Sequence, residues 1–216
     1  MYRGMFATGG IHPEALMRIT GGIWRGRRFP IVVPAGVRPT MDRVRKALFD
    51  RLQGMIALQG IIVADLFAGT GTLGIEALSR GATYCIFVER NRRLTEFLHC
   101  VLSLLTLNPR HYRIITGDVF RVLRYWEELD LPRPHLLFAD PPYQSLLGNR
   151  LLRALAESHW LRPGALLCLE LSRWETVAHA PAGWQLHSER LFGETRLQWW
   201  YWHGTDNATS TLPGDL

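Results

Sequence analysis

Short apolar runs alternate with amphipathic segments through the middle of the chain. The runs have the length and composition of buried strands, and we predict strands at Ile61–Leu66, Thr83–Glu89, Tyr112–Thr116, Leu136–Ala139 and Ala165–Leu171. Between them, apolar residues recur at helical spacing, which predicts helices at Thr72–Ser79, Arg92–Leu105, Val119–Glu128 and Leu146–Ser158. This alternation is typical of an α/β fold in which helices cover both faces of a parallel sheet.

The segments before and after this alternating part have different patterns. Residues 18–33 alternate around glycines and predict a β-hairpin arm, and Met41–Leu52 has the spacing of a helix capped by Thr40. Two aromatic-rich runs, Trp184–Phe192 and Thr195–Trp202, predict an antiparallel hairpin. We therefore expect flexible tails at 1–17 and 204–216, an arm with its helix at 18–52, and a main domain at 53–203.

The composition is that of one soluble globular domain. Of the 216 residues, 47% are hydrophobic and 20% are charged, which excludes a largely disordered chain. No apolar run reaches the roughly 20 residues of a membrane helix, and the start does not resemble a secretory signal. We expect a cytoplasmic protein with no membrane partner. The cysteines and histidines lack the spacing of metal ligands, so we expect no metal site.

The positive charge is confined to one segment. The chain has a net charge of +6, and the nine basic and two acidic residues between Arg18 and Arg51 account for all of this excess. Arginine binds phosphate bidentately, and both arginine and aromatic rings stack on bases. The segment therefore predicts nucleic-acid contact, with a merely solvated basic arm as the alternative. The candidate RNA-binding residues are Arg18, Trp24, Arg25, Arg27, Arg28, Arg38, Thr40 and Arg43.

A glycine-rich motif follows the first predicted strand. Residues 65–74 contain the spacing G-x-G-x-x-G, and Glu89 lies 20 residues after the first of these glycines, where an acid can bind ribose hydroxyls. A nicotinamide-dependent dehydrogenase would have a similar motif. However, Asp65 would repel a pyrophosphate and attract the ammonium and sulfonium groups of S-adenosylmethionine (SAM). The candidate cofactor-binding residues are Asp65, Phe67, Ala68, Gly69, Gly71, Gly74, Glu89, Arg90, Asp118 and Val119.

Two further carboxylates follow the third and fourth predicted strands. Asp118 could accept a hydrogen bond from the exocyclic amine of adenine, or it could only cap the next helix. Asp140-Pro141-Pro142-Tyr143 is more specific, and these four are the candidate catalytic residues. The prolines stiffen the loop, so that the Asp140 carboxylate and the Pro141 carbonyl can accept both hydrogens of a nucleobase amine, while the Tyr143 ring stacks on the base. A proline turn with a capping aspartate is the alternative.

Together these motifs resemble a known enzyme family. Asp65-x-Phe67-x-Gly69-x-Gly71 with Asp140-Pro141-Pro142-Tyr143 is similar to the class I SAM-dependent methyltransferases that modify nucleobase amines. The stretches at residues 18–27 and 38–45 narrow the resemblance to the bacterial 16S rRNA methyltransferases that modify N2 of guanine 966. Phe192-Gly193-Glu194-Thr195 also resembles the final hairpin of that family. The chain departs from this family at Lys46, where glutamate is expected, and at Tyr143, where phenylalanine is frequent.

The resemblance implies a Rossmann-like class I methyltransferase fold. Its sheet would be seven-stranded and mostly parallel, with helices on both faces and an N-terminal β-hairpin arm. It also implies SAM as the cofactor, 16S rRNA or the assembling small ribosomal subunit as the partner, and methyl transfer to guanine N2 as the reaction. We expect the protein to be a monomer. The alternatives are a DNA adenine-N6 methyltransferase and a non-catalytic RNA-binding module with a vestigial cofactor pocket.

Overall fold

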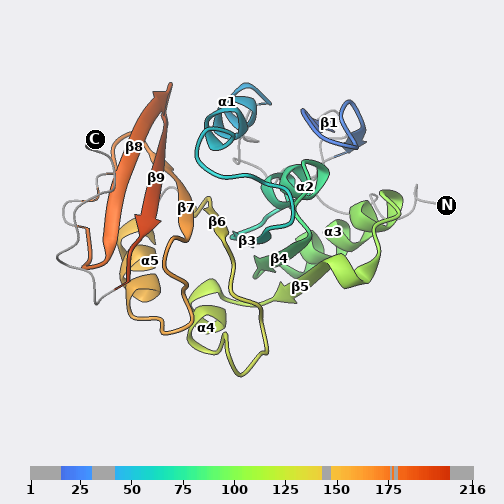
Figure 1. Cartoon of the computed structure of the whole chain (residues 1–216). Coiled ribbons are helices and arrows are strands. Elements are labelled where there is room, and N and C mark those ends of the chain that lie inside the picture. The colour runs from blue at the N-terminus through green and yellow to red at the C-terminus, as the bar shows by residue number, and fades with distance from the viewer. Residues whose placement is uncertain (1–15, 31–41, 143–146, 176, 178–179, 205–216) are drawn as a thin grey trace.

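A seven-stranded sheet forms the centre of the molecule (Figure 1). The computed structural model describes residues 16–30, 42–142, 147–175, 177 and 180–204. The strands follow the spatial order β5-β4-β3-β6-β7-β9-β8. Their bounds are β3 (Ile62–Leu66), β4 (Tyr84–Glu89), β5 (Tyr112–Thr116), β6 (Leu136–Ala139), β7 (Leu166–Ser172), β8 (Trp184–Phe192) and β9 (Thr195–Trp202).

Of the seven strands in this sheet, β9 alone runs against the others. All pairings from β5 to β7 are parallel, whereas β9 runs antiparallel to both β7 and β8. The central strands are buried on both faces, as in β6, where every residue is buried, and this explains their nearly uniform apolar sequence. The prediction of a seven-stranded, mostly parallel α/β sheet is confirmed, and each strand lies within one residue of its predicted bounds.

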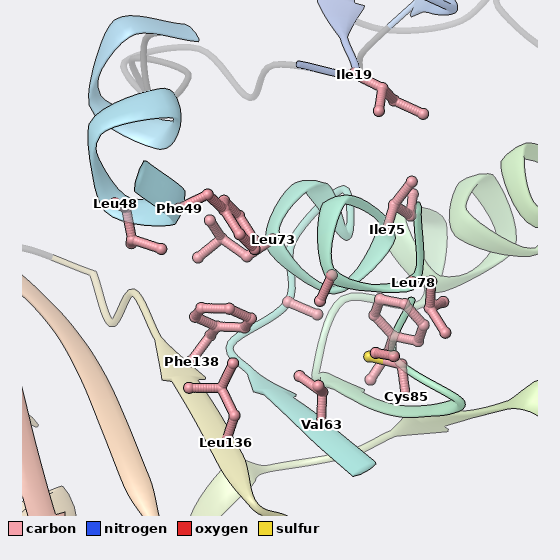
Figure 2. Packing of buried hydrophobic residues seen from close by; sticks show 14 of the residues in the cluster. Ile19, Leu48, Phe49, Val63, Leu73, Ile75, Leu78, Cys85, Leu136 and Phe138 are labelled. Carbon is pink, nitrogen blue, oxygen red and sulfur yellow. The ribbon is translucent and has the colours of Figure 1, made fainter. Parts of the chain in front are cut away.

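Helices cover both faces of the sheet and divide the core in two. On one face α1 (Asp42–Leu52), α2 (Thr72–Ser79) and α3 (Arg92–Leu104) contribute to one apolar cluster. Figure 2 shows Phe49 of α1 beside Phe138 of β6, with ring centroids 5.5 Å apart. On the other face α4 (Val119–Arg124) and α5 (Leu147–Ala156) contribute to a second cluster, in which Trp126 stacks on Trp160 at 4.2 Å.

This aromatic stack explains why one helix is shorter than predicted. We expected a helix to Glu128, but α4 ends at Arg124 and Tyr125 leaves the helical conformation with φ −106° and ψ 27°. The change in direction turns the Trp126 ring into the core, where it is fully buried against Trp160. The free energy gained by burying a large aromatic side chain is greater than the free energy gained by extending a short helix.

The N-terminal arm is a two-stranded antiparallel ribbon, as predicted. It consists of β1 (Leu16–Arg18) and β2 (Arg28–Pro30), while the last part of the predicted hairpin, residues 31–33, lies outside the described residues. The predicted boundary of the first tail is wrong by two residues, because Met17 pairs with Phe29 and is only 2% exposed. Its apolar side chain belongs to the core, which ties the chain down from Leu16 onward. Residues 1–15 and 205–216 lie outside the described part.

Candidate active site

The predicted site residues meet at one edge of the sheet. Leu66, the last residue of β3, pairs with Val88 of β4 on one side and with Ala139 of β6 on the other. The next residue of each strand therefore emerges at the same edge, and these residues are Phe67, Glu89 and Asp140. The structure brings the glycine motif and the Asp140 motif together, as their positions after parallel strands predict.

The loop after β3 has a backbone that depends on its glycines. Phe67, Gly69 and Gly71 have φ values of 61°, 56° and 76°, in the left-handed region. An added Cβ at Gly71 would lie 2.4 Å from Leu98, and one at Gly74 would lie 2.3 Å from the Phe87 ring. The loop thus packs closely on the strands and α3, and Gly71 leads directly into α2.

Glu89 holds this loop through its carboxylate. One oxygen accepts a hydrogen bond from the Gly69 N–H at 2.9 Å, and the other accepts one from the Asn91 N–H at 2.8 Å. With 9% of its surface exposed, Glu89 is nearly buried at the bottom of the edge. The carboxylate that the sequence assigns to ribose hydroxyls therefore also fixes the shape of the loop.

Asp65 is buried beneath the same loop. Its Oδ2 accepts a hydrogen bond from the Gly74 N–H at 2.9 Å, and the side chain is 3% exposed. Burial raises the pKa of Asp65 from 3.8 to about 8; the Gly74 hydrogen bond opposes this shift and the nearby Glu89 adds to it. Two buried carboxyl groups, Asp65 and Glu89, therefore lie under one glycine loop.

The other predicted cofactor residues lie on the β4 and β5 side of this edge. Ala68 and Val119 are buried, whereas Arg90 and Asp118 are exposed. Asp118 caps α4, since its side chain accepts a hydrogen bond from the Arg121 N–H at 3.1 Å. The Phe67 ring meets Phe120 edge to face at 6.2 Å, which gives the loop an aromatic wall on this side.

The catalytic motif follows β6. Asp140 is half-buried, Pro141 is buried and Pro142 is exposed, so the loop turns from the interior to the surface within three residues. Tyr143, the fourth predicted catalytic residue, lies outside the described residues. The arrangement leaves an acceptor-bearing turn next to the glycine loop, which suits a ligand that spans both.

The arm places four of its predicted RNA-binding arginines on the surface. Arg18, Arg25, Arg27 and Arg28 are all exposed. Arg43 lies in α1, and Arg38 and Thr40 lie outside the described residues. The prediction that Trp24 stacks on RNA is contradicted, because its side chain is 8% exposed and belongs to the core cluster. A ring buried in this way has no free face for a base.

A buried polar cluster that the sequence analysis missed joins the arm to α2. Glu76 is fully buried and accepts hydrogen bonds from the Thr20 N–H at 2.9 Å, the Thr20 hydroxyl at 2.7 Å and Arg80 Nε at 2.8 Å. Arg45 of α1, 2% exposed, lies 3.6 Å from the same carboxylate and also donates to the Arg18 carbonyl. The sequence signal that could have indicated this cluster is Glu76, a single acidic residue in the otherwise apolar helix α2.

The backbone of the arm also contacts α2. The Ser79 hydroxyl donates to the Gly21 carbonyl at 2.6 Å and accepts from the Trp24 N–H at 3.0 Å. Gly22 has φ +77°, and an added Cβ would overlap the Ser79 carbonyl oxygen at 1.7 Å. Gly71 is the residue that caps the start of α2, so the helix that the arm contacts directly follows the glycine loop.

The described part of the chain has neither a cluster of metal ligands nor a membrane-spanning helix. No three His, Cys, Asp or Glu side chains come together as metal ligands there. No described helix is long and apolar enough to cross a membrane.

Comparison with known proteins gives the family. A family model described as conserved hypothetical protein 95 matches residues 17–201. The chain belongs to this family. Among its relatives, the ribosomal RNA small subunit methyltransferase D of Escherichia coli is 35% identical over 179 residues, which cover 82% of this chain and 86% of that protein. The resemblance drawn from the motifs is thereby confirmed.

Solved structures agree with this family and fold. An Escherichia coli protein described as "Putative methyltransferase yhhF" is 29% identical with a TM-score of 0.73, and the match covers 88% of this chain and 99% of that chain. A methyltransferase named SMU.776, solved in complex with SAH, has a TM-score of 0.68 at 14% identity and covers 90% of this chain and 57% of that chain. The second match shows the shared fold alone.

Proposed function

We propose that this member of the family transfers a methyl group from SAM to the exocyclic N2 of guanine 966 in 16S rRNA. The register of β3 and β6 carries the proposal, because Leu66 pairs with Ala139 and the glycine loop and Asp140 therefore leave the sheet side by side. A cofactor held by the glycine loop and an amine held by Asp140 would therefore lie close enough to react. The name of the Escherichia coli relative supports an rRNA substrate.

The residues of the loop fit SAM. The left-handed glycines bring the backbone close to a ligand, and Glu89 offers carboxylate oxygens to hydroxyl groups. Asp65, buried beneath the loop, holds its shape through the Gly74 N–H. Phe67, Ala68, Gly69, Gly71 and Gly74, together with Arg90, Asp118 and Val119, complete the proposed cofactor site. When bound, SAM supplies a methyl group as an electrophile on its sulfonium sulfur.

The chain's own contribution to the chemistry is to hold the amine. In the proposed complex the guanine is flipped out of its stack against Tyr143, and its N2 hydrogens are donated to the Asp140 carboxylate and the Pro141 carbonyl. Two acceptors fix the nitrogen and favour the pyramidal geometry in which its lone pair attacks. Once the new N–C bond has formed, the acidic N–H proton leaves to Asp140 or to water, so a strong base is unnecessary.

We propose that the arm holds the rRNA. The exposed guanidinium groups of Arg18, Arg25, Arg27 and Arg28 supply the phosphate contacts, with Arg38, Thr40 and Arg43 as further candidates. In this division residues 18–52 bind RNA and residues 53–203 carry out catalysis. We propose that the enzyme acts as a monomer in the cytoplasm, on naked 16S rRNA or on the assembling small subunit.

The decisive experiment follows a labelled methyl group from SAM into 16S rRNA, small ribosomal subunits and DNA, and then maps the modified base. We expect label at N2 of one guanine. Label in DNA adenine would support the rival activity, and binding of rRNA with no transfer to any substrate would support a non-catalytic module. Stabilisation by SAM but not by NAD in a thermal-shift assay excludes a dehydrogenase.

A variant of Asp140 tests its proposed role in holding the substrate amine. Asp140→Ala should abolish turnover and leave SAM affinity unchanged, because Asp140 holds the substrate amine and not the cofactor. Glu157→Ala removes an exposed carboxylate at the C-terminal end of α5 and serves as the matched control. An equal loss of SAM affinity and turnover in Asp140→Ala would contradict the role.

A further inference from the structure

One tryptophan is placed unlike the others. All eight tryptophans lie in the described part of the chain, and seven of them are at most 8% exposed. Trp174 is 78% exposed. Exposing so large an apolar ring to water is unfavourable, and tryptophan in such a position is characteristic of binding surfaces.

Trp174 lies at the edge of the sheet that holds the proposed active site. It follows β7, which pairs in parallel with β6 and ends at the same edge. Leu169 of β7 pairs with Ala139 of β6, so Glu170 lies level with Asp140 and Trp174 comes four residues later. Even in a fully extended chain, the Cα atoms of Trp174 and Asp140 are then no more than about 14 Å apart.

We propose that Trp174 and Arg173 form a stacking site for a nucleotide that flanks the methylated guanine in the RNA. This inference rests on the proposed function and extends it to a second nucleotide of the same substrate. In the proposed complex the target base is held by Asp140 and Pro141, and Trp174 lies four residues beyond the position level with Asp140. A neighbouring unpaired base of the same strand is within its reach.

The chemistry of the pair suits a nucleotide. The Arg173 guanidinium lies over one face of the Trp174 ring, 5.1 Å from its centroid. The exposed ring offers a flat apolar surface to any base, and the guanidinium beside it attracts the phosphate that the base carries. A purely apolar partner protein would gain nothing from that charge.

Hydrogen bonds hold the backbone of Arg173, the residue before the exposed ring. The Arg173 N–H donates to the Glu194 carbonyl at 2.8 Å, and the Arg173 carbonyl accepts from the Arg196 side chain at 2.8 Å. The neighbouring Glu175 is buried and accepts from the Gly148 N–H at 3.1 Å. Its carboxylate is therefore buried and is not presented on the surface beside Trp174.

These contacts suggest a role for the motif at the tip of the β8–β9 hairpin, which has no part in the proposed catalytic site. Glu194 lies in the tip of the β8–β9 hairpin, and Thr195 pairs with Ser172 at the end of β7. The tip therefore supports the corner that carries Arg173 and Trp174. Contacts between the hairpin tip and this corner are consistent with a defined position for the flanking nucleotide.

The test measures the affinity of the full-length protein for a 16S rRNA fragment that contains the target guanine, in the presence of SAH so that no methyl is transferred. Trp174→Ala should weaken binding by about 5- to 150-fold, the range for loss of one stacked base. Trp174→Phe keeps a ring and should restore most of the affinity. Tyr125→Ala removes another exposed aromatic ring, at the end of α4, and should have no effect.

An abasic scan then identifies the nucleotide. Fragments with one base removed at each position beside the guanine are bound to wild type and to Trp174→Ala. At one position, loss of the base should weaken wild-type binding and leave Trp174→Ala unchanged. Thermal denaturation and SAM affinity equal to wild type show that the variant is folded.

The outcomes separate this proposal from the proposed function. Equal affinities of wild type and Trp174→Ala, or an abasic profile that is the same for both, would overturn the stacking site even if the enzyme methylates rRNA. Loss of affinity in Trp174→Ala without any methyl transfer by wild type would support the stacking site and refute the function. Failure of the wild type to bind RNA would refute both.

Discussion

Replacement of Asp65 by asparagine should stabilise the protein, and more so as the pH rises. The carboxyl group keeps its proton in the folded state up to a pKa of about 8, whereas in the unfolded chain it ionises near 3.8. Between these values the folded state binds one more proton than the unfolded state, so the free energy of unfolding falls with pH by at most about 1.4 kcal/mol per pH unit. Above pH 8 the loss is complete.

The expected magnitude follows from the same two pKa values. Relative to pH 3.8, the wild type loses up to about 4 kcal/mol by pH 7 and about 6 kcal/mol by pH 9 because of this group alone. Asp65→Asn has no such loss, and its amide oxygen still accepts from the Gly74 N–H. The difference in unfolding free energy between variant and wild type should therefore grow from near zero at pH 4 to several kcal/mol at pH 9.

Urea denaturation of both proteins at pH 5, 7 and 9 measures this difference, because groups common to both cancel. Asp65→Ala is the matched control. It also lacks the ionising group, but it leaves the buried Gly74 N–H without a partner at a constant cost of about 1–3 kcal/mol. A difference between Asp65→Asn and wild type that stays the same at all three pH values would refute the reasoning.

The remaining predictions concern the arm. Glu76→Ala should lower the free energy of unfolding by about 3–5 kcal/mol, because it leaves Arg45 and Arg80 without their carboxylate. Urea denaturation measures this change, and Glu76→Gln should lower the free energy of unfolding by less. Equal stability of Glu76→Ala and wild type would contradict the buried cluster. Replacement of Arg25 and Arg27 together by alanine should weaken RNA binding and reduce its dependence on salt concentration, since each arginine that contacts a phosphate adds about 0.7–0.9 to the slope. An unchanged slope in a salt titration would argue against phosphate contacts by these residues.

The fold could be predicted from the sequence because its central strands are buried on both faces. Leu136–Ala139, for example, has no polar residue, and a run of this kind between helical patterns has few other interpretations. The carboxyl ends of parallel strands share one edge, so the proximity of Gly69 and Asp140 also followed from the pattern.

The arm was harder to predict because its side chains are placed by distant contacts. Trp24 stands among arginines and was expected to face RNA, but it packs in the core while its N–H donates to Ser79, 55 residues away. Likewise, the attraction between Arg45 and Glu76 joins residues of different helices. Neither periodicity nor local charge distinguishes a basic residue on the surface from one that is buried beside an acid.

The attachment of the arm to α2 has a thermodynamic consequence. That short helix touches Thr20 and Gly21 at one end and begins in the glycine loop at the other. If bound rRNA changes the affinity of the protein for SAM through this helix, bound SAM changes the affinity for rRNA by the same factor. Measured in either order of addition, the two ligands would report the same number, and that number would state how strongly substrate recognition and cofactor retention depend on each other.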